Sequence, residues 1–121
     1  MPHTATEFVK QYAEKTVNRM RTGLDLNISE IGQIVGADRR TITRWFNHQC
    51  KPSPSHRKRL ELLNQFMHLL SISFRNKETM FEWLHSPLPS LQGRTPLYAA
   101  QDNELEEVVK ILGTLAAGAF R

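Results

Sequence analysis

The chain has 121 residues, a net charge of +4 and a single cysteine, Cys50. This length fits one domain, or two small domains that share a core, and one cysteine excludes an internal disulfide, as expected in a reducing compartment. No apolar stretch is long enough to cross a membrane and no signal peptide is recognisable, so we expect a cytoplasmic protein without a membrane partner.

The charge is distributed unevenly along the chain. Residues 1–75 hold twelve Lys and Arg against six Asp and Glu, whereas residues 76–121 hold four against six. Only the first part is therefore suited to a negatively charged backbone such as that of DNA. Helix-forming residues dominate throughout and no segment alternates apolar with polar residues, which predicts an all-α fold.

A first helix is predicted from about Thr4 or Thr6 to Thr22, with Gly23 at its end. Apolar residues recur within it at helical spacing and predict its buried face: Phe8, Tyr12, Ala13, Val17 and Met20. We expect this face to pack against the two short helices that follow.

The most informative segment runs from residue 27 to residue 46 and predicts two short helices joined by a tight turn. Asn27 and Glu30 have the spacing of a capping box, which begins the first helix. Gly36 stands where a helix ends in a left-handed residue. Gly32 lies where a larger side chain would hold the second helix away from the first. Together these features outline a helix-turn-helix.

The second of these helices is the predicted recognition helix. Asp38 caps it, and Ile42 with Trp45, three residues later, forms its buried face. The other side chains face outward, where such a helix meets base edges in the major groove. The candidate DNA contacts are Arg39, Arg40, Thr41, Thr43, Arg44 and Asn47. The alternative is an ordinary helical hairpin whose arginines are only solvated.

A second basic group follows in the next turn and helix. Ser53 and Pro54 predict the cap and the first position of this helix, and its apolar residues are Leu60, Leu63, Phe66, Met67 and Leu70. Basic side chains near its start are expected to grip phosphates beside the groove. The candidate phosphate contacts are Lys51, Arg57 and Lys58. The alternative is a solvated basic turn without a partner.

The next part of the chain predicts two short helices around a proline-rich segment. An aromatic-rich helix around Met80–Leu84 stops before Pro87. Thr95 and Pro96 then predict the cap and first position of a helix that runs through Ala100. The leucines between these helices need burial, so the segment is expected to be ordered rather than a flexible linker.

A final helix is predicted from the spacing of Asn103 and Glu106, which is that of a capping box. Apolar residues at helical spacing define its expected buried face: Leu105, Val108, Val109, Leu112 and Leu115. The glutamates in its first turn are explained by the helix dipole before any catalytic role.

The sequence offers no recognisable catalytic or metal site. Its five histidines lack the spacing and the cysteine partners of a structural zinc site. Cys50 has no evident orienting base, and the glycines are too scattered to form a phosphate-binding loop. We therefore expect a protein that is not an enzyme and that holds no metal or cofactor.

Around its recognition helix the chain resembles the Xre-like helix-turn-helix repressors, where a segment of the type Gly-x-Ser-Arg-Arg-Thr-Val-x-Arg-Trp is common. The matching positions are Gly36, Arg39, Arg40, Thr41, Ile42, Arg44 and Trp45. Asp38 stands in place of the usual serine and puts an acidic group close to the expected phosphates.

From Met80 onward the chain resembles the C-terminal toxin-binding domain of the Xre/MbcA/ParS antitoxin family. The matching residues are Leu91-x-Gly93-Arg94-x-Pro96-Leu97, which is the most specific part, Trp83-Leu84, Pro87, the Glu-Glu-Val-Val at 106–109, Leu112 and Gly118. The chain departs from the family at Gln101–Glu104, where many members have a glycine-containing turn.

The resemblance implies a helix-turn-helix helical bundle over residues 1–75 and a small helical toxin-binding and dimerisation domain over residues 76–121. It implies a type II antitoxin that binds its toxin, often of the RES type that degrades NAD, and that represses its own operon. A homodimer on a palindromic operator follows from twofold symmetry. The implied toxin-binding residues are Trp83, Leu91, Gly93, Arg94, Gly118, Phe120 and Arg121.

Alternatives to these implications stay open at the level of sequence. The segment Gly113–Arg121, which the resemblance implies as a plug for the toxin's active site, has the composition of a frayed tail. The whole chain is alternatively a stand-alone helix-turn-helix transcriptional regulator without a toxin partner, which an adjacent toxin gene would exclude. A third reading is an adaptor that binds only proteins, which predicts no salt-dependent DNA binding.

Overall fold

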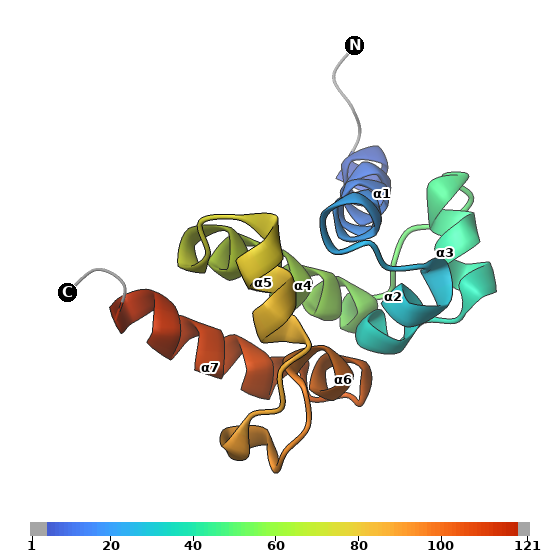
Figure 1. Ribbon diagram of the computed structural model, residues 1–121. Coiled ribbons are helices and arrows are strands. Elements are labelled where there is room, and N and C mark those ends of the chain that lie inside the picture. Colours follow the sequence, from blue (N-terminus) through green and yellow to red (C-terminus); the bar gives the residue numbers. More distant parts are fainter. Residues whose placement is uncertain (1–4, 119–121) are drawn as a thin grey trace. The chain divides into compact units, whose positions relative to one another are not determined.

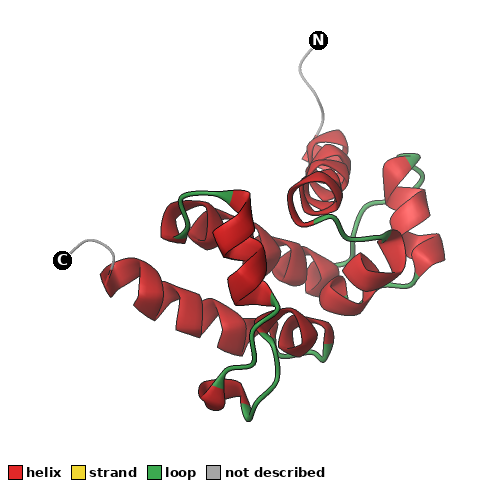
Figure 2. Ribbon diagram, viewed as in Figure 1, coloured by secondary structure: helices red, strands yellow, loops and turns green. Residues whose placement is uncertain are grey.

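The computed structural model describes residues 5–118, with side chains from Gln11 onward. This part of the chain contains helices and turns but no strands (Figure 2), which confirms the predicted all-α class. Its elements are α1 (Ala5–Leu24), α2 (Ile28–Val35), α3 (Arg39–Phe46), α4 (Pro54–Ser73), α5 (Lys77–Leu84), the 3-10 turn η1 (Pro89–Leu91), α6 (Pro96–Gln101) and α7 (Leu105–Gly118). None of these helices has the length and apolar character that a membrane crossing demands.

The chain divides into two compact units, Met1–Glu61 and Leu62–Arg121. The division falls inside α4, whereas the sequence placed a domain boundary after residue 75. Leu63, Phe66 and Leu70, in the later part of α4, are buried and belong to the second unit. The long helix therefore contributes to both units, which apolar periodicity along a single helix does not reveal. Figure 1 follows the chain through these helices.

In the first unit, α1 packs against α2 and α3, and α2 packs against α3. Ala13, Val17, Met20, Ile42 and Trp45 are buried as helical spacing predicted, and the buried side chains of α2 are Ile31, Ile34 and Val35. Tyr12 is only half-buried. The side chain of Phe8, which the sequence placed on the same face of α1, lies outside the described residues.

The first helix ends later than predicted. α1 includes Gly23 and Leu24, and the residue with left-handed backbone is Asp25, whose φ is 57°. Aspartate tolerates this conformation better than most residues because its short polar side chain can hydrogen-bond locally. Leu24 and Leu26 on either side are 3% and 6% exposed, so two buried anchors hold the turn.

In the second unit, α5 packs against α6, and α6 packs against α7. The predicted cap at Thr95 is confirmed by a hydrogen bond, and the structure adds a cap at Asn76 that the sequence analysis did not identify. Asn76 Oδ1 accepts from the N–H of Thr79 at 2.8 Å, and Thr95 Oγ1 accepts from the N–H of Tyr98 at 3.1 Å. The buried residues beyond α4 are Leu84, Leu91, Pro96, Ala99, Ala100, Leu105, Val108, Val109, Leu112 and Ala116.

The start of α7 differs from the prediction. Asn103 does not cap the helix; it has a left-handed backbone with φ of 64°, and α7 begins at Leu105. The N–H of Glu104 donates to the carbonyl of Ala99 at 2.9 Å, which closes the turn against α6. Asn103 thus supplies the positive φ that a glycine supplies elsewhere in such turns. A polar residue three positions before a glutamate suggested a capping box, but local spacing does not encode the turn.

One residue of the predicted α7 core is misplaced. Leu115 is 42% exposed, and Ala116 is buried at 4% exposure in its place. The buried stripe continues from Leu112 to Ala116 by a step of four residues, which leaves Leu115 at the edge of the stripe. An exposed leucine of this kind is available to a partner.

Candidate functional site

Hydrogen bonds stabilise both ends of α2, the first helix of the helix-turn-helix. The side chain of Asn27 accepts from the N–H of Glu30 at 2.8 Å, and the Glu30 carboxylate accepts from the N–H of Asn27 at 3.0 Å. At the other end Gly36 has φ of 78°, and its N–H donates to the carbonyl of Gly32. The predicted capping box and left-handed glycine are therefore confirmed.

Gly32 is required by the backbone of the same turn. A Cβ at this position would lie 2.5 Å from the carbonyl oxygen of Ala37 and 3.5 Å from Cδ1 of Ile42. The sequence predicted that a larger residue would hold the second helix away. The closer obstacle is the backbone of the turn, so glycine is needed first to let the chain turn into α3.

The recognition helix presents a polar face as the sequence predicted. Ile42 and Trp45 are 0% and 1% exposed, whereas the side chains pointing to solvent are Arg39, Arg40, Thr43, Arg44 and Asn47. Arg40, Arg44 and Asn47 follow one another at helical spacing and form one stripe. Arg39 and Thr43 form a second stripe that ends at the half-buried Phe46.

The sequence predicted Thr41 as a DNA contact. In the structure it is half-buried and also takes part in capping α3. Its N–H donates to Asp38 Oδ1 at 2.8 Å. Hydrogen bonds from the side chain and backbone of Thr41, with smaller effects of the Arg40 and His56 charges, hold the pKa of the Asp38 carboxyl below its usual range. Asp38 is therefore ionised at neutral pH, where it stabilises the start of α3 and repels phosphates.

His56 connects the start of α4 to the turn of the helix-turn-helix. Its Nε2 donates to the carbonyl oxygen of Gly36 at 3.1 Å, and its Nδ1 lies 3.0 Å from the hydroxyl of Ser53. The ring packs edge-on against Trp45, with 5.4 Å between ring centroids. Sequence spacing gave no sign of this contact, because the partners are far apart along the chain. His56 is thus a positioning residue for both basic segments.

The second basic group lies beside this connection. Arg57 and Lys58 follow His56 in the first turns of α4, and Lys51 lies in the preceding turn; all three side chains are exposed. Because His56 is bonded to Gly36, the start of α4 keeps a fixed relation to the turn before α3. The arrangement suits a surface on which α3 and the start of α4 meet one ligand.

The most recognisable motif of the second unit is a loop closed on itself. Gln92 and Gly93 have left-handed backbones, with φ of 56° and 82°. The N–H of Gly93 donates to the carbonyl of Leu88 at 2.9 Å, and the N–H of Leu88 donates to the carbonyl of Arg94 at 3.1 Å. Leu91 is 2% exposed and anchors the loop in the core.

Arg94 connects this loop to the turn before α7. Its Nε donates to the carbonyl of Leu91 at 2.9 Å, and its other guanidinium nitrogens pair with Glu104 at 2.5 Å and Asp102 at 3.4 Å. The Arg94 side chain is 25% exposed. These contacts give the Gly93-Arg94 pair a structural function within the unit.

The other predicted toxin-binding residues lie in different surroundings. Trp83 is half-buried, with its ring centroid 5.6 Å from that of Phe74. Gly118 is exposed at the last position of α7. Phe120 and Arg121 lie outside the described residues.

A groove of about 360 Å³ adjoins Trp83. It is lined by Trp83, Leu88, Ser90, Ile111, Thr114 and Leu115. The exposed Leu115 stands in this groove, and the sequence missed the site because it assigned Leu115 to the core. Apolar side chains on a groove at the surface are typical of protein-binding sites.

Comparisons with known proteins find matches both to the later part of the chain and to most of its length. A family model described as the antitoxin Xre/MbcA/ParS C-terminal toxin-binding domain matches residues 69–118. The chain is 30% identical over 106 residues to the mycobacterial cidal antitoxin MbcA of Mycobacterium tuberculosis, and equally to that of Mycobacterium bovis. The match covers 87% of this chain and 92% of the relative.

Solved structures give the same result. The chain is similar to a chain in the crystal structure of the M. tuberculosis MbcT-MbcA toxin-antitoxin complex, with a TM-score of 0.63 and 26% identity. The likeness covers 93% of this chain and 96% of that chain. It therefore includes the helix-turn-helix as well as the residues that the family model matches.

Proposed function

Because the chain belongs to the Xre/MbcA/ParS family of antitoxins, we propose that it neutralises a cognate toxin by direct binding and represses its own operon by binding DNA. The observation that carries this proposal is the joining of two parts in one chain. Residues 69–118 match a toxin-binding domain, and the preceding unit is a helix-turn-helix with an exposed polar recognition helix. The family is one of antitoxins rather than of enzymes.

The proposed DNA-binding surface is the solvent face of α3 with the start of α4. Arg40 and Arg44 are suited to paired hydrogen bonds with guanine, and Asn47 extends their stripe. The exposed Lys51, Arg57 and Lys58 contact phosphates and fix the register of the helix in the groove. A homodimer would place two recognition helices about 34 to 36 Å apart on a palindromic operator.

The proposed toxin-binding surface is the groove beside Trp83, continued along α7 to the chain end. Leu115 and Trp83 offer apolar area that a partner can bury. Leu91 and Arg94 support this surface from within, because one is buried and the other bonds to the chain itself. The end segment with Gly118, Phe120 and Arg121 is proposed to reach the toxin's active site. A RES-type toxin is the partner class proposed from the family.

Co-expression with the adjacent gene tests the toxin half of the proposal. The adjacent gene alone should arrest growth, and the full chain should restore growth and co-purify with its product. A truncation after Gly118 should retain the fold, since α7 ends there, and should weaken neutralisation. Full neutralisation by the truncated chain would exclude a role of residues 119–121 in the plug, and an adjacent gene that is harmless and does not bind would leave a stand-alone regulator.

Alanine substitutions test the DNA half. Arg40→Ala and Arg44→Ala should each cost about 1 to 3 kcal/mol of binding to the promoter and relax base preference. Lys58→Ala should weaken binding to all sequences alike. Equal and sequence-independent losses from all three variants would show that α3 does not read bases, and an absence of salt-dependent binding would favour the protein-binding adaptor.

A further inference from the structure

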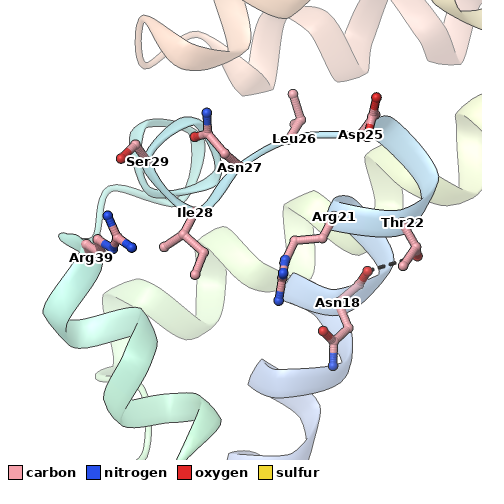
Figure 3. Close-up of a pocket in the computed structure, with 9 residues that line it drawn as sticks. All are labelled: Asn18, Arg21, Thr22, Asp25, Leu26, Asn27, Ile28, Ser29 and Arg39. Atoms are coloured by element: carbon pink, nitrogen blue, oxygen red, sulfur yellow. Dashed lines mark hydrogen bonds between the residues drawn. The ribbon is translucent and has the colours of Figure 1, made fainter.

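A hollow of about 680 Å³ lies within the first unit, at the start of the recognition helix. It is bordered by the last turns of α1, the start of α2 and the first residue of α3 (Figure 3). Its size falls within the range of pockets that hold a small organic molecule. Of the predicted DNA contacts, Arg39 alone lines the hollow. The DNA-binding surface predicted from the sequence therefore gives the hollow no role.

The lining of the hollow suits an anion. Its polar groups are two guanidinium groups, two amides, two hydroxyls and one carboxylate, from Arg21, Arg39, Asn18, Asn27, Thr22, Ser29 and Asp25. Figure 3 shows the Arg21 and Arg39 side chains directed toward the same space from α1 and α3, and the Asp25 side chain directed away from them. In the part of the chain that the structure describes, neither guanidinium has a carboxylate partner.

Arg21 of α1 contacts the end of α3. Its guanidinium lies over the ring of Phe46, 5.9 Å from the centroid. Phe46 is the last residue of α3, and Arg39 is the first. Arg39, Thr43 and Phe46 share one stripe of α3, and of these three residues Arg39 lines the hollow.

A helix lying in the major groove has a sugar-phosphate backbone beside each flank. We propose that this hollow receives a backbone phosphate of the operator, bound by Arg21 together with Arg39 and Asn18. Phosphate oxygens accept hydrogen bonds from guanidinium, amide and hydroxyl donors, so the lining matches the ligand chemistry. The inference rests on the proposed DNA-binding function and adds a contact from α1 that the sequence did not indicate.

Three variants of α1, each lowering the net charge by one, test the site. Arg21→Gln removes a cation from the hollow and Asn18→Asp adds an anion to it. Lys15→Gln removes an exposed cation outside the hollow and is the matched control. The probes are a duplex from the promoter of the chain's own gene and a scrambled duplex of equal length, with binding measured by fluorescence anisotropy from low to moderate KCl.

The expected result is a several-fold loss of affinity for both duplexes in Arg21→Gln and Asn18→Asp. The slope of log K against log[KCl] should become shallower by about 1 in Arg21→Gln, because one phosphate contact is lost. Lys15→Gln should keep the wild-type slope. Thermal unfolding of each variant identifies any loss of fold, and Asn18→Asp leaves the contact of Arg21 with Phe46 in place.

The two proposals fail in different ways. A wild-type chain without salt-dependent binding to either duplex would contradict the proposed DNA function and this site with it. Steep wild-type binding, with Arg21→Gln and Asn18→Asp indistinguishable from Lys15→Gln, would overturn the phosphate site alone. In that case the hollow is a feature of the packing of α1 against α3.

Discussion

The two units of the chain place their recognisable motifs in opposite surroundings. In the first unit, the motif residues of α3 separate into a buried pair, Ile42 and Trp45, and an exposed polar set. In the second unit, the most specific motif folds into a loop whose leucine is buried and whose arginine bonds to Glu104 and Asp102. The polar side chains of the first motif are exposed to solvent, whereas the leucine and arginine of the second motif make contacts within their own unit.

This difference changes what a motif match means in each unit. The polar residues of α3 are available to DNA, so the motif and the proposed contact surface coincide. In the second unit the motif marks the scaffold, and the available apolar surface lies beside it at Trp83 and Leu115. A family signature can thus contain residues whose contacts lie within the domain itself, as Leu91 and Arg94 show.

The largest expected effect is on the core of the first unit. Trp45→Ala should lower the free energy of unfolding by about 3 to 5 kcal/mol, because the ring is fully buried. Trp83→Ala is the matched control and should cost less than half of that, since its ring is partly exposed. Urea unfolding measures both; equal losses would contradict the contrast between the two tryptophans.

The next largest effects are expected at two glycines, where substitution by alanine should destabilise the first unit and stabilise the second. Gly32→Ala should destabilise by about 1 to 3 kcal/mol, because its Cβ meets a backbone carbonyl. Gly113→Ala, in the middle of α7 with open space around it, should stabilise by about 0.5 to 1 kcal/mol. Thermal unfolding checks both changes, and a neutral Gly32→Ala would show that the turn has room to adjust.

Arg94 tests whether the motif of the second unit is structural. Arg94→Ala should destabilise by about 1 to 2 kcal/mol, a reduced value for hydrogen bonds to charged groups because the side chain is partly exposed. Lys110→Ala breaks an exposed pair with Glu107 on α7 and should change stability by less than about 0.5 kcal/mol. If Arg94→Ala keeps full stability but loses toxin binding, the arginine contacts the toxin directly.

The smallest effect concerns pH and Asp38. Its pKa is lowered in the folded state, so its contribution to stability is present above the unfolded pKa and is lost as the pH falls through the folded value. Asp38→Asn keeps a capping side chain and should remove this acid-sensitive part of the stability curve. It should also bind DNA more tightly at neutral pH. An unchanged acid profile would contradict the role of the Asp38 charge.

Much of the fold was predictable because the signals are local. The caps at Asn27, Asp38 and Thr95 and the left-handed Gly36 follow from a few neighbouring residues. The left-handed Asn103 was missed because local spacing favoured a capping box at the same place.

The contacts between distant residues were not predictable. His56 bonds to Gly36, and Arg21 lies over Phe46, at separations along the chain that no periodicity encodes. The exposure of Leu115 depends on which side of α7 meets its neighbours. The candidate DNA contacts of α3 were therefore located by sequence, whereas the hollow and the groove required the structure.

We propose that two surfaces of one chain carry two separable activities. The most direct measurement compares Arg40→Ala/Arg44→Ala with Leu115→Asp for binding to the promoter duplex and to the purified toxin, at matched thermal stability. We expect the arginine variant to lose binding to the promoter and keep binding to the toxin, and Leu115→Asp to do the reverse. A folded variant that loses both ligands together, or neither, would contradict it.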